Sequence, residues 1–312
     1  MTTYRLAHAR PAQPAPPTLD AFQRSVVDHP GGPLLVLAGP GTGKTTTLVE
    51  AIVDRVDSRG ADPESVLALT FSRKAAEQLR DRVTARLGRT MATTLSSTFH
   101  SFAYGLVRRY SPVDLYAAPL RLLSAPEQDV ILQELLSGNR ESALWPVGLG
   151  QALGTRGFAR EVQAVLSRAR EKGLDPLDLK LLGEQADAPE LVAAATFMQQ
   201  YHVILDDQSL IDYPELIHRA VMLAEQPAVR HDLRARFAHV FVDEYQDTDP
   251  SQVRLLQALA GDGRDLTVVG DPDQSIYAFR GAEVRGILDF PRAFPQRDGS
   301  PAATVALRVT RR

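Results

Sequence analysis

The sequence predicts an α/β fold in which a mainly α-helical segment interrupts a parallel sheet. Up to about residue 110, apolar runs of strand length alternate with stretches whose apolar residues recur at helical spacing. Strand signal then nearly disappears over residues 111–208, and apolar runs of strand length return from residue 239. Alternation of strands and helices is typical of a parallel sheet, because each crossover helix returns the chain to the same edge.

The first third of the chain predicts a βαβα order. A short helix over Asp20–Val27 precedes an apolar run, Leu34 to Ala38, that has the length of a buried strand. The further expected elements are a helix over Thr46–Val56, a strand over Val66–Thr70, a helix from Arg73 to about Leu87, a strand over Thr93–Thr98 and a helix near Phe99–Arg109.

The remaining two thirds divide into a helical part and a second set of strands. Expected helices include Glu127–Leu136, Phe158–Lys172 and Leu191–Leu205, with joints at Pro146–Gly148 and Gly173–Pro176. Expected strands are His239–Asp243, Leu266–Gly270 and Ala303–Val309. The sequence therefore predicts one parallel α/β core with a helical insertion.

The turn after the first strand has the composition of a phosphate-binding loop. Its glycines and the start of the next helix would present backbone N–H groups to an anion. Lys44 would reach the terminal phosphates of a nucleoside triphosphate, and the Thr45 hydroxyl would bind Mg²⁺. The alternative is an ordinary glycine-rich turn, and the first glycine position of the motif is an alanine here. The residues expected to bind ATP are Ala38, Gly39, Pro40, Gly41, Thr42, Gly43, Lys44, Thr45 and Thr46.

Two adjacent carboxylates follow the strand that begins at His239. An acidic residue at the carboxyl end of a buried strand suits Mg²⁺ ligation beside the phosphates, which predicts that role for Asp243. Glu244 is then the candidate general base for the attacking water. Taken alone, the pair is better explained as solvated turn residues or helix caps, and the phosphate-binding loop is what favours a site.

Composition restricts the class of protein. The chain of 312 residues has a formal net charge of −3, so a basic nucleic-acid surface would have to be local. It contains no cysteine, which excludes disulfides and thiolate catalysis. Met1 to Pro17 lacks the apolar core of a signal peptide, and no apolar run approaches the ~20 residues of a membrane-spanning helix. We expect a cytoplasmic protein without a membrane partner.

Four further stretches, together with Gln23, identify a family. They are Thr70–Ala76, Thr98–Phe102, VDEYQDTDPSQ from Val242 and GDPDQSIYAFRGA from Gly270. In order and spacing they resemble the motifs of superfamily 1 helicases of the UvrD/Rep/PcrA kind. Within that family, Thr155–Pro176 and the terminal VALRVTRR look most like the AdnA-type subunit of a heterodimeric helicase–nuclease.

The resemblance implies two RecA-like domains, the first interrupted by a helical subdomain. The boundaries that we expect are a flexible lead over 1–17, the RecA-like ATPase domain over 18–110 and 209–302, the helical insertion over 111–208, and the start of a second RecA-like domain over 303–312. The arginine finger of that second domain would lie beyond these residues. We therefore expect this chain alone to bind ATP and Mg²⁺ but to hydrolyse ATP poorly.

The resemblance also implies roles around the nucleotide. Gln23 matches the residue that reads the adenine edge, although Asp20-x-x-Gln23 also resembles a capping box. Gln274 matches the glutamine that senses the γ-phosphate, and Arg312 aligns with an arginine that touches it.

A second set of residues matches positions that contact single-stranded DNA. Aromatic side chains beside an arginine suit base stacking with a phosphate contact. Core packing is the alternative for the aromatic residues, and a cap or surface position is the alternative for the histidine. The residues expected to contact DNA are Phe71, Arg73, His100, Tyr277, Phe279 and Arg280, with Arg73 replacing an asparagine-like residue.

The resemblance implies an ATP-dependent DNA helicase that moves 3′→5′ on single-stranded or 3′-tailed DNA in repair or recombination, with a helicase–nuclease subunit as a partner. The alternative is a subunit that binds nucleotide and DNA without doing productive work.

Overall fold

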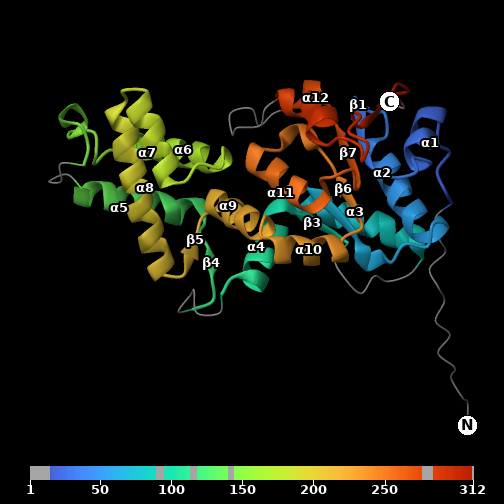
Figure 1. Ribbon diagram of the computed structural model, residues 1–312, viewed down its shortest axis with the longest axis horizontal. Coiled ribbons are helices and arrows are strands. Elements are labelled where there is room, and N and C mark those ends of the chain that lie inside the picture. Colours follow the sequence, from blue (N-terminus) through green and yellow to red (C-terminus); the bar gives the residue numbers. More distant parts are fainter. Residues whose placement is uncertain (1–14, 89–94, 113–117, 140–143, 276–283, 311–312) are drawn as a thin grey trace, which may run out of the picture.

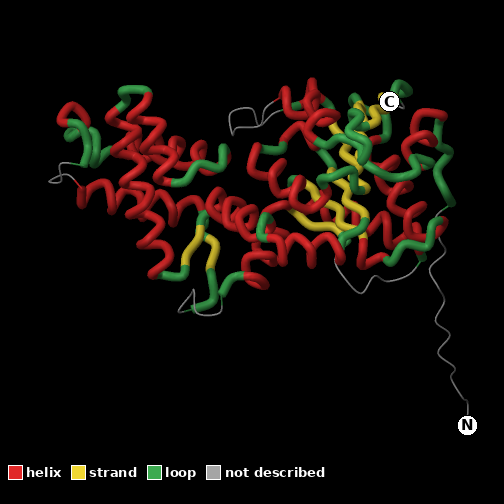
Figure 2. The backbone as a smooth tube through the Cα atoms, in the orientation of Figure 1, coloured by secondary structure: helices red, strands yellow, loops and turns green. Residues whose placement is uncertain are grey.

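The computed structural model describes residues 15–88, 95–112, 118–139, 144–275 and 284–310. A six-stranded sheet with the strand order β3-β2-β6-β7-β1-β8 forms its centre, and every described strand pair is parallel. The strands are yellow in Figure 2. The α/β prediction is confirmed. The strands span Pro33–Ala38 (β1), Val66–Thr70 (β2), Ser96–Thr98 (β3), His239–Val242 (β6), Asp265–Gly270 (β7) and Ala303–Leu307 (β8).

Helices cover both faces of this sheet, because successive side chains of a strand point to opposite faces. In β1, Leu34 and Val36 pack into one apolar cluster, while Leu35 packs into the other. The first cluster includes residues of α1 (Ala21–Val27), α2 (Lys44–Val53) and α3 (Arg73–Leu87). The second includes residues of α4 (Phe99–Tyr110), α9 (Tyr213–Ala224), α10 (Pro227–Arg236), α11 (Pro250–Ala260) and α12 (Val284–Ala293).

The insertion has an apolar core of its own, to one side of the sheet (Figure 1). Trp145, Phe197 and Tyr201 are buried in it. Its helices are α5 (Ala125–Gly138), α6 (Arg156–Glu171), α7 (Pro176–Gln185) and α8 (Pro189–Asp207). Helix α7, which is not among the expected helices named for the insertion, begins at the end of the expected joint Gly173–Pro176, because Asp175 caps a helix whose first residue is a proline. A short parallel pair, β4 (Arg121–Leu122) with β5 (Leu210–Ile211), lies at the base of the insertion.

The last strand corrects the expected boundary at residue 303. Strand β8 pairs in parallel with β1, and Val36 faces Val305 in the register. Leu307 is buried in the same apolar cluster as Val36. Residues 303–307 therefore belong to the first sheet, and the start of a second RecA-like domain stays a prediction.

Smaller differences concern element ends. Helix α2 begins at Lys44 rather than Thr46 and continues into a π-helical turn over Asp54–Ser58. Of the strand expected over Thr93–Thr98, residues 93 and 94 lie outside the described part of the chain. Among the described residues, no helix is long and apolar enough to cross a membrane.

Candidate active site

The loop between β1 and α2 lies at the carboxyl edge of the sheet. Gly41 and Gly43 have positive φ values of 75° and 84°, which favour glycine. Gly43 is the residue before α2, so the turn leads directly into the helix N-terminus. Thr42 closes the turn because its hydroxyl donates to the Gly39 carbonyl at 2.7 Å. A glycine-rich loop at a helix N-terminus fits a phosphate group.

Gln23 holds this loop from the N-terminal helix. Its Nε2 donates to the Thr42 carbonyl at 3.1 Å, and a Cβ on Gly43 would lie 2.5 Å from the same nitrogen. The capping box is present too, since Asp20 and Gln23 exchange backbone-to-side-chain hydrogen bonds. Gln23 thus caps α1 and packs against the loop, while adenine recognition stays a prediction.

Strand order brings the two predicted carboxylates to the same edge. β6 and β1 both flank β7, so Asp243 and Glu244 follow a strand end close to the loop. Lys44 Nζ donates to Glu244 Oε2 at 3.2 Å. Glu244 has a φ of 53°, and its backbone N–H donates to Asp243 Oδ1 at 3.0 Å. Asp243 is therefore held by its neighbour's backbone, while Glu244 pairs with Lys44.

Asp243 is 7% exposed, and its environment changes its acidity. Burial, followed by the charge of Glu244, raises the pKa of Asp243 to about 6, while Lys44 opposes the rise. A nearby cation would favour the ionised carboxylate. Asp243 and the half-buried Thr45 are oxygen donors of the kind that Mg²⁺ binds, so these side chains fit the ion.

A continuous series of hydrogen bonds leads from Lys44 towards the segment after β7. Gln246 Nε2 donates to Glu244 Oε2 at 2.8 Å, and Gln246 Oε1 accepts from the Asp271 N–H at 3.0 Å. Asp271 in turn accepts from Gln274 Nε2 at 2.5 Å. Gln246 and Asp271 are 2% and 4% exposed, so the series is buried at its centre. The two predicted residues Lys44 and Gln274 are thereby connected.

A cavity of about 810 Å³ brings together three of the predicted DNA-contacting residues. Phe71 follows β2, Arg73 begins α3 and His100 is in the first turn of α4; all three line the cavity. Tyr213, at the start of α9, lines it too, and its ring lies edge-on to His100 with centroids 5.1 Å apart. Phe71 also packs edge-on against Phe99 at 6.4 Å, so part of its surface belongs to the core.

Four predicted site residues cannot be placed. Tyr277, Phe279, Arg280 and Arg312 lie outside the described residues. Their expected contacts with DNA and phosphate stay predictions.

Comparison with known proteins agrees with this geometry. Residues 19–295 match the UvrD/REP helicase N-terminal domain. The chain belongs to the UvrD/REP helicase family. It is 34% identical over 307 residues to the ATP-dependent DNA helicase UvrD1 of Mycobacterium tuberculosis, covering 92% of this chain and 38% of that protein. DNA helicase II of Escherichia coli is 31% identical over 280 residues, which cover 89% of this chain and 37% of that protein.

A third relative gives the same picture. The ATP-dependent DNA helicase PcrA of Staphylococcus aureus is 30% identical over 280 residues, covering 89% of this chain and 36% of that protein. This UvrD/REP-family chain therefore spans a little over a third of the length of these relatives.

The tertiary structure brings three further residues into these sites, none of which is among the predicted site residues. Gln246 stands in the VDEYQDTDPSQ stretch and Asp271 in the GDPDQSIYAFRGA stretch. The signal in the sequence is a polar residue inside a family motif, and both side chains are buried in the structure. Tyr213 carries no comparable signal, because it reaches His100 only through the packing of α9 against α4.

Proposed function

We propose that this chain is the ATP-binding part of a DNA helicase motor that couples ATP hydrolysis to 3′→5′ movement on single-stranded DNA. The observation that carries the proposal is the series of hydrogen bonds, buried at its centre, from Lys44 through Glu244, Gln246 and Asp271 to Gln274. Such a series gives the phosphate-binding loop a direct mechanical connection to the segment that follows β7.

The roles at the nucleotide follow from position and charge. Lys44 would hold the terminal phosphates, and Thr45 with Asp243 would hold Mg²⁺. The ion would neutralise charge that develops on the phosphates. Glu244 would accept a proton from the attacking water, since its carboxylate is 39% exposed beside the loop. When Lys44 turns to a phosphate, Glu244 loses its ion pair and becomes available as a base.

The roles at DNA rest on the cavity beside α4. Phe71 and Tyr213 offer ring surfaces for base stacking, and Arg73 offers a charge for the backbone of a single strand or a 3′ tail. His100 lines the same cavity, and Tyr213 packs against its ring. We include Tyr213 in the proposed DNA site on this geometry.

The narrower assignment, to an AdnA-type subunit with a helicase–nuclease partner, is also a proposal. The insertion stretch Thr155–Pro176 supports it. Purification of the natural complex tests it directly, because a partner subunit with nuclease activity should copurify with this chain. A role in repair or recombination would follow from such a partner.

The deciding experiment measures ATP hydrolysis with and without single-stranded DNA. It compares this chain, a C-terminally extended chain and the Glu244→Gln variant of each. We expect weak turnover by this chain, DNA-stimulated turnover by the extended chain, and loss of turnover with Glu244→Gln while ATP binding persists. Absence of DNA stimulation in both wild-type chains would instead favour a nucleotide-binding structural subunit.

The DNA site has its own matched test. Phe71→Ala and Tyr213→Ala should each weaken binding of a fluorescent oligothymidylate by about 1–3 kcal/mol, the usual contribution of one stacked base. Arg73→Gln should weaken it and reduce its salt dependence. Arg80→Gln is the control, because Arg80 is on the same helix, 41% exposed, and does not line the cavity.

A further inference from the structure

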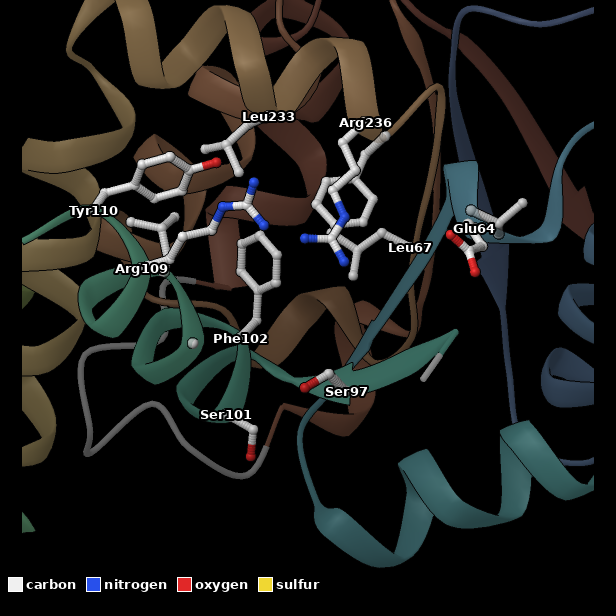
Figure 3. A pocket seen from close by; sticks show the side chains of 13 residues that line it. Glu64, Leu67, Ser97, Ser101, Phe102, Arg109, Tyr110, Leu233 and Arg236 are labelled. Carbon is white, nitrogen blue, oxygen red and sulfur yellow. The ribbon is translucent and has the colours of Figure 1, made fainter. Parts of the chain in front are cut away.

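A second groove, of about 600 Å³, is shown in Figure 3. From α4 it takes Phe102, Leu106 and Arg109, whereas the proposed DNA site takes His100 and Tyr104. It is bounded by α4, the C-terminal end of α10 and the first residues of β2. Val66 and Leu67 begin β2, whereas the phosphate-binding loop and Asp243 follow the carboxyl ends of their strands. Since the sheet is parallel, this groove is away from the nucleotide site.

The floor of the groove is apolar and fixed by the protein core. Leu67, Leu106 and Leu233 line it and are 3–4% exposed. Phe102 is half-buried and meets Phe237 edge-on, with ring centroids 5.8 Å apart. A floor that is already packed needs little rearrangement to accept an apolar side chain, so binding costs little conformational entropy.

The rim of the groove carries more positive than negative charge. Figure 3 shows the guanidinium groups of Arg109 and Arg236 both directed into the space above Phe102. Arg236 stacks over Phe237 at 5.1 Å and makes no ion pair within the described part of the chain. Arg109 lies over the Tyr110 ring at 5.4 Å, and its ion-pair partner among the described residues is the exposed Asp232 at 3.6 Å; such surface pairs contribute little. Among the residues that the structure describes, Glu64 is the one carboxylate in the lining.

We propose that this groove docks a peptide segment of a partner protein, in which an apolar side chain stands between carboxylates. The apolar side chain buries against Phe102 and the leucines, and the carboxylates pair with Arg109 and Arg236 in charge-assisted hydrogen bonds. Strand β3 is one of the two edge strands of the described sheet and its Ser97 lines the groove, which suits a segment in extended conformation. A nucleic acid fits less well, because aliphatic side chains make up most of the floor, whereas bases stack best on aromatic ones.

The test measures fluorescence anisotropy with a panel of labelled octapeptides in which Leu, Phe, Tyr or Trp stands between Asp and Glu residues. We expect selective binding by members of this panel and at least about tenfold weaker binding by charge-reversed peptides and by peptides with Gly in place of the apolar residue. Arg236→Glu and Arg109→Glu should each weaken binding about tenfold. Arg80→Glu, which changes an exposed arginine outside the groove, should not weaken it. ATP affinity should be unchanged in all three variants, which shows that they are folded.

Several outcomes would overturn the proposal. One is that no panel member binds below about 1 mM, a free energy too small for a docking site. Others are that Arg236→Glu leaves peptide affinity unchanged, or that oligothymidylate displaces the peptide in wild type and loses affinity with Arg236→Glu, which would assign the groove to nucleic acid. Self-association that Arg236→Glu abolishes would assign it to a second copy of this chain. Because none of these measurements uses ATP hydrolysis, failure here is distinct from failure of the proposed motor function.

Discussion

Glu215→Gln should destabilise the protein strongly, because Glu215 is the common partner of three basic side chains at the joint between the insertion and the sheet. Its carboxylate lies 2.6 Å from Arg170 Nε, 2.7 Å from Arg219 Nε and 3.5 Å from His202 Nε2. Arg170 is on α6 and His202 on α8, whereas Glu215 is on α9. Burial alone would raise the pKa of Glu215, but the charges of His202, Arg170 and Arg219 hold it below its usual value.

The magnitude follows from burial. The side chains of Arg170 and Glu215 are 7% and 5% exposed, so removing one charge leaves the other desolvated and uncompensated. Breaking such a buried pair costs about 3–5 kcal/mol. The exposed pair Arg254–Glu225, at 2.9 Å, provides the contrast, since its side chains are 35% and 41% exposed. Glu225→Gln should cost less than about 1 kcal/mol.

The assay is urea unfolding at pH 7, followed by the fluorescence of Trp145. This residue is the one tryptophan of the chain and is 7% exposed in the core of the insertion, so its signal reports the insertion. A double-mutant cycle with Arg170→Met should show a coupling of at least about 1 kcal/mol. If Glu215→Gln costs no more than Glu225→Gln, the argument from desolvation is wrong.

Three further predictions concern single positions. Gly43→Ala should weaken ATP binding at least about tenfold, because Gly43 has a φ of 84° and a Cβ there would meet Gln23 Nε2. The control is Gly60→Ala, which has a φ of 70° and open space around it and should leave ATP binding unchanged. Tyr245→Phe should leave the free energy of unfolding in urea unchanged or raise it by up to about 1 kcal/mol, because the buried hydroxyl has no hydrogen-bond partner among the described residues. A decrease of more than about 1 kcal/mol would contradict this prediction. Burial lowers the pKa of His202 from 6.5 to about 4. As the pH falls from 6.5 to 4, the unfolded state therefore binds more protons, and the free energy of unfolding of the wild type should fall by up to about 3 kcal/mol relative to that of His202→Gln. Parallel pH profiles of the two free energies would refute the prediction.

The sequence alone determined most of the elements and the glycine-rich turn before α2, because both depend on local chemistry. The apolar run Val66–Thr70 predicts a buried strand without reference to any distant residue, and β2 has these bounds. The ordered glycines before Lys44 predict a loop that other residues would strain to form. The paired carboxylates after β6 were identified by the same reasoning, from a strand end and its neighbours.

Only the tertiary structure decided which distant segments meet. Residues 303–307 carry a strand pattern, yet their place beside β1 follows from parallel pairing, which has no local signal. The links from Glu244 through Gln246 to Asp271 require β6 and β7 to end side by side. Tyr213 lines the same cavity as His100 because α9 packs on α4, although the insertion separates the two helices in the sequence. Local sequence specifies each element through its own periodicity, but contacts between remote segments form only when burial of apolar faces selects one arrangement of those elements.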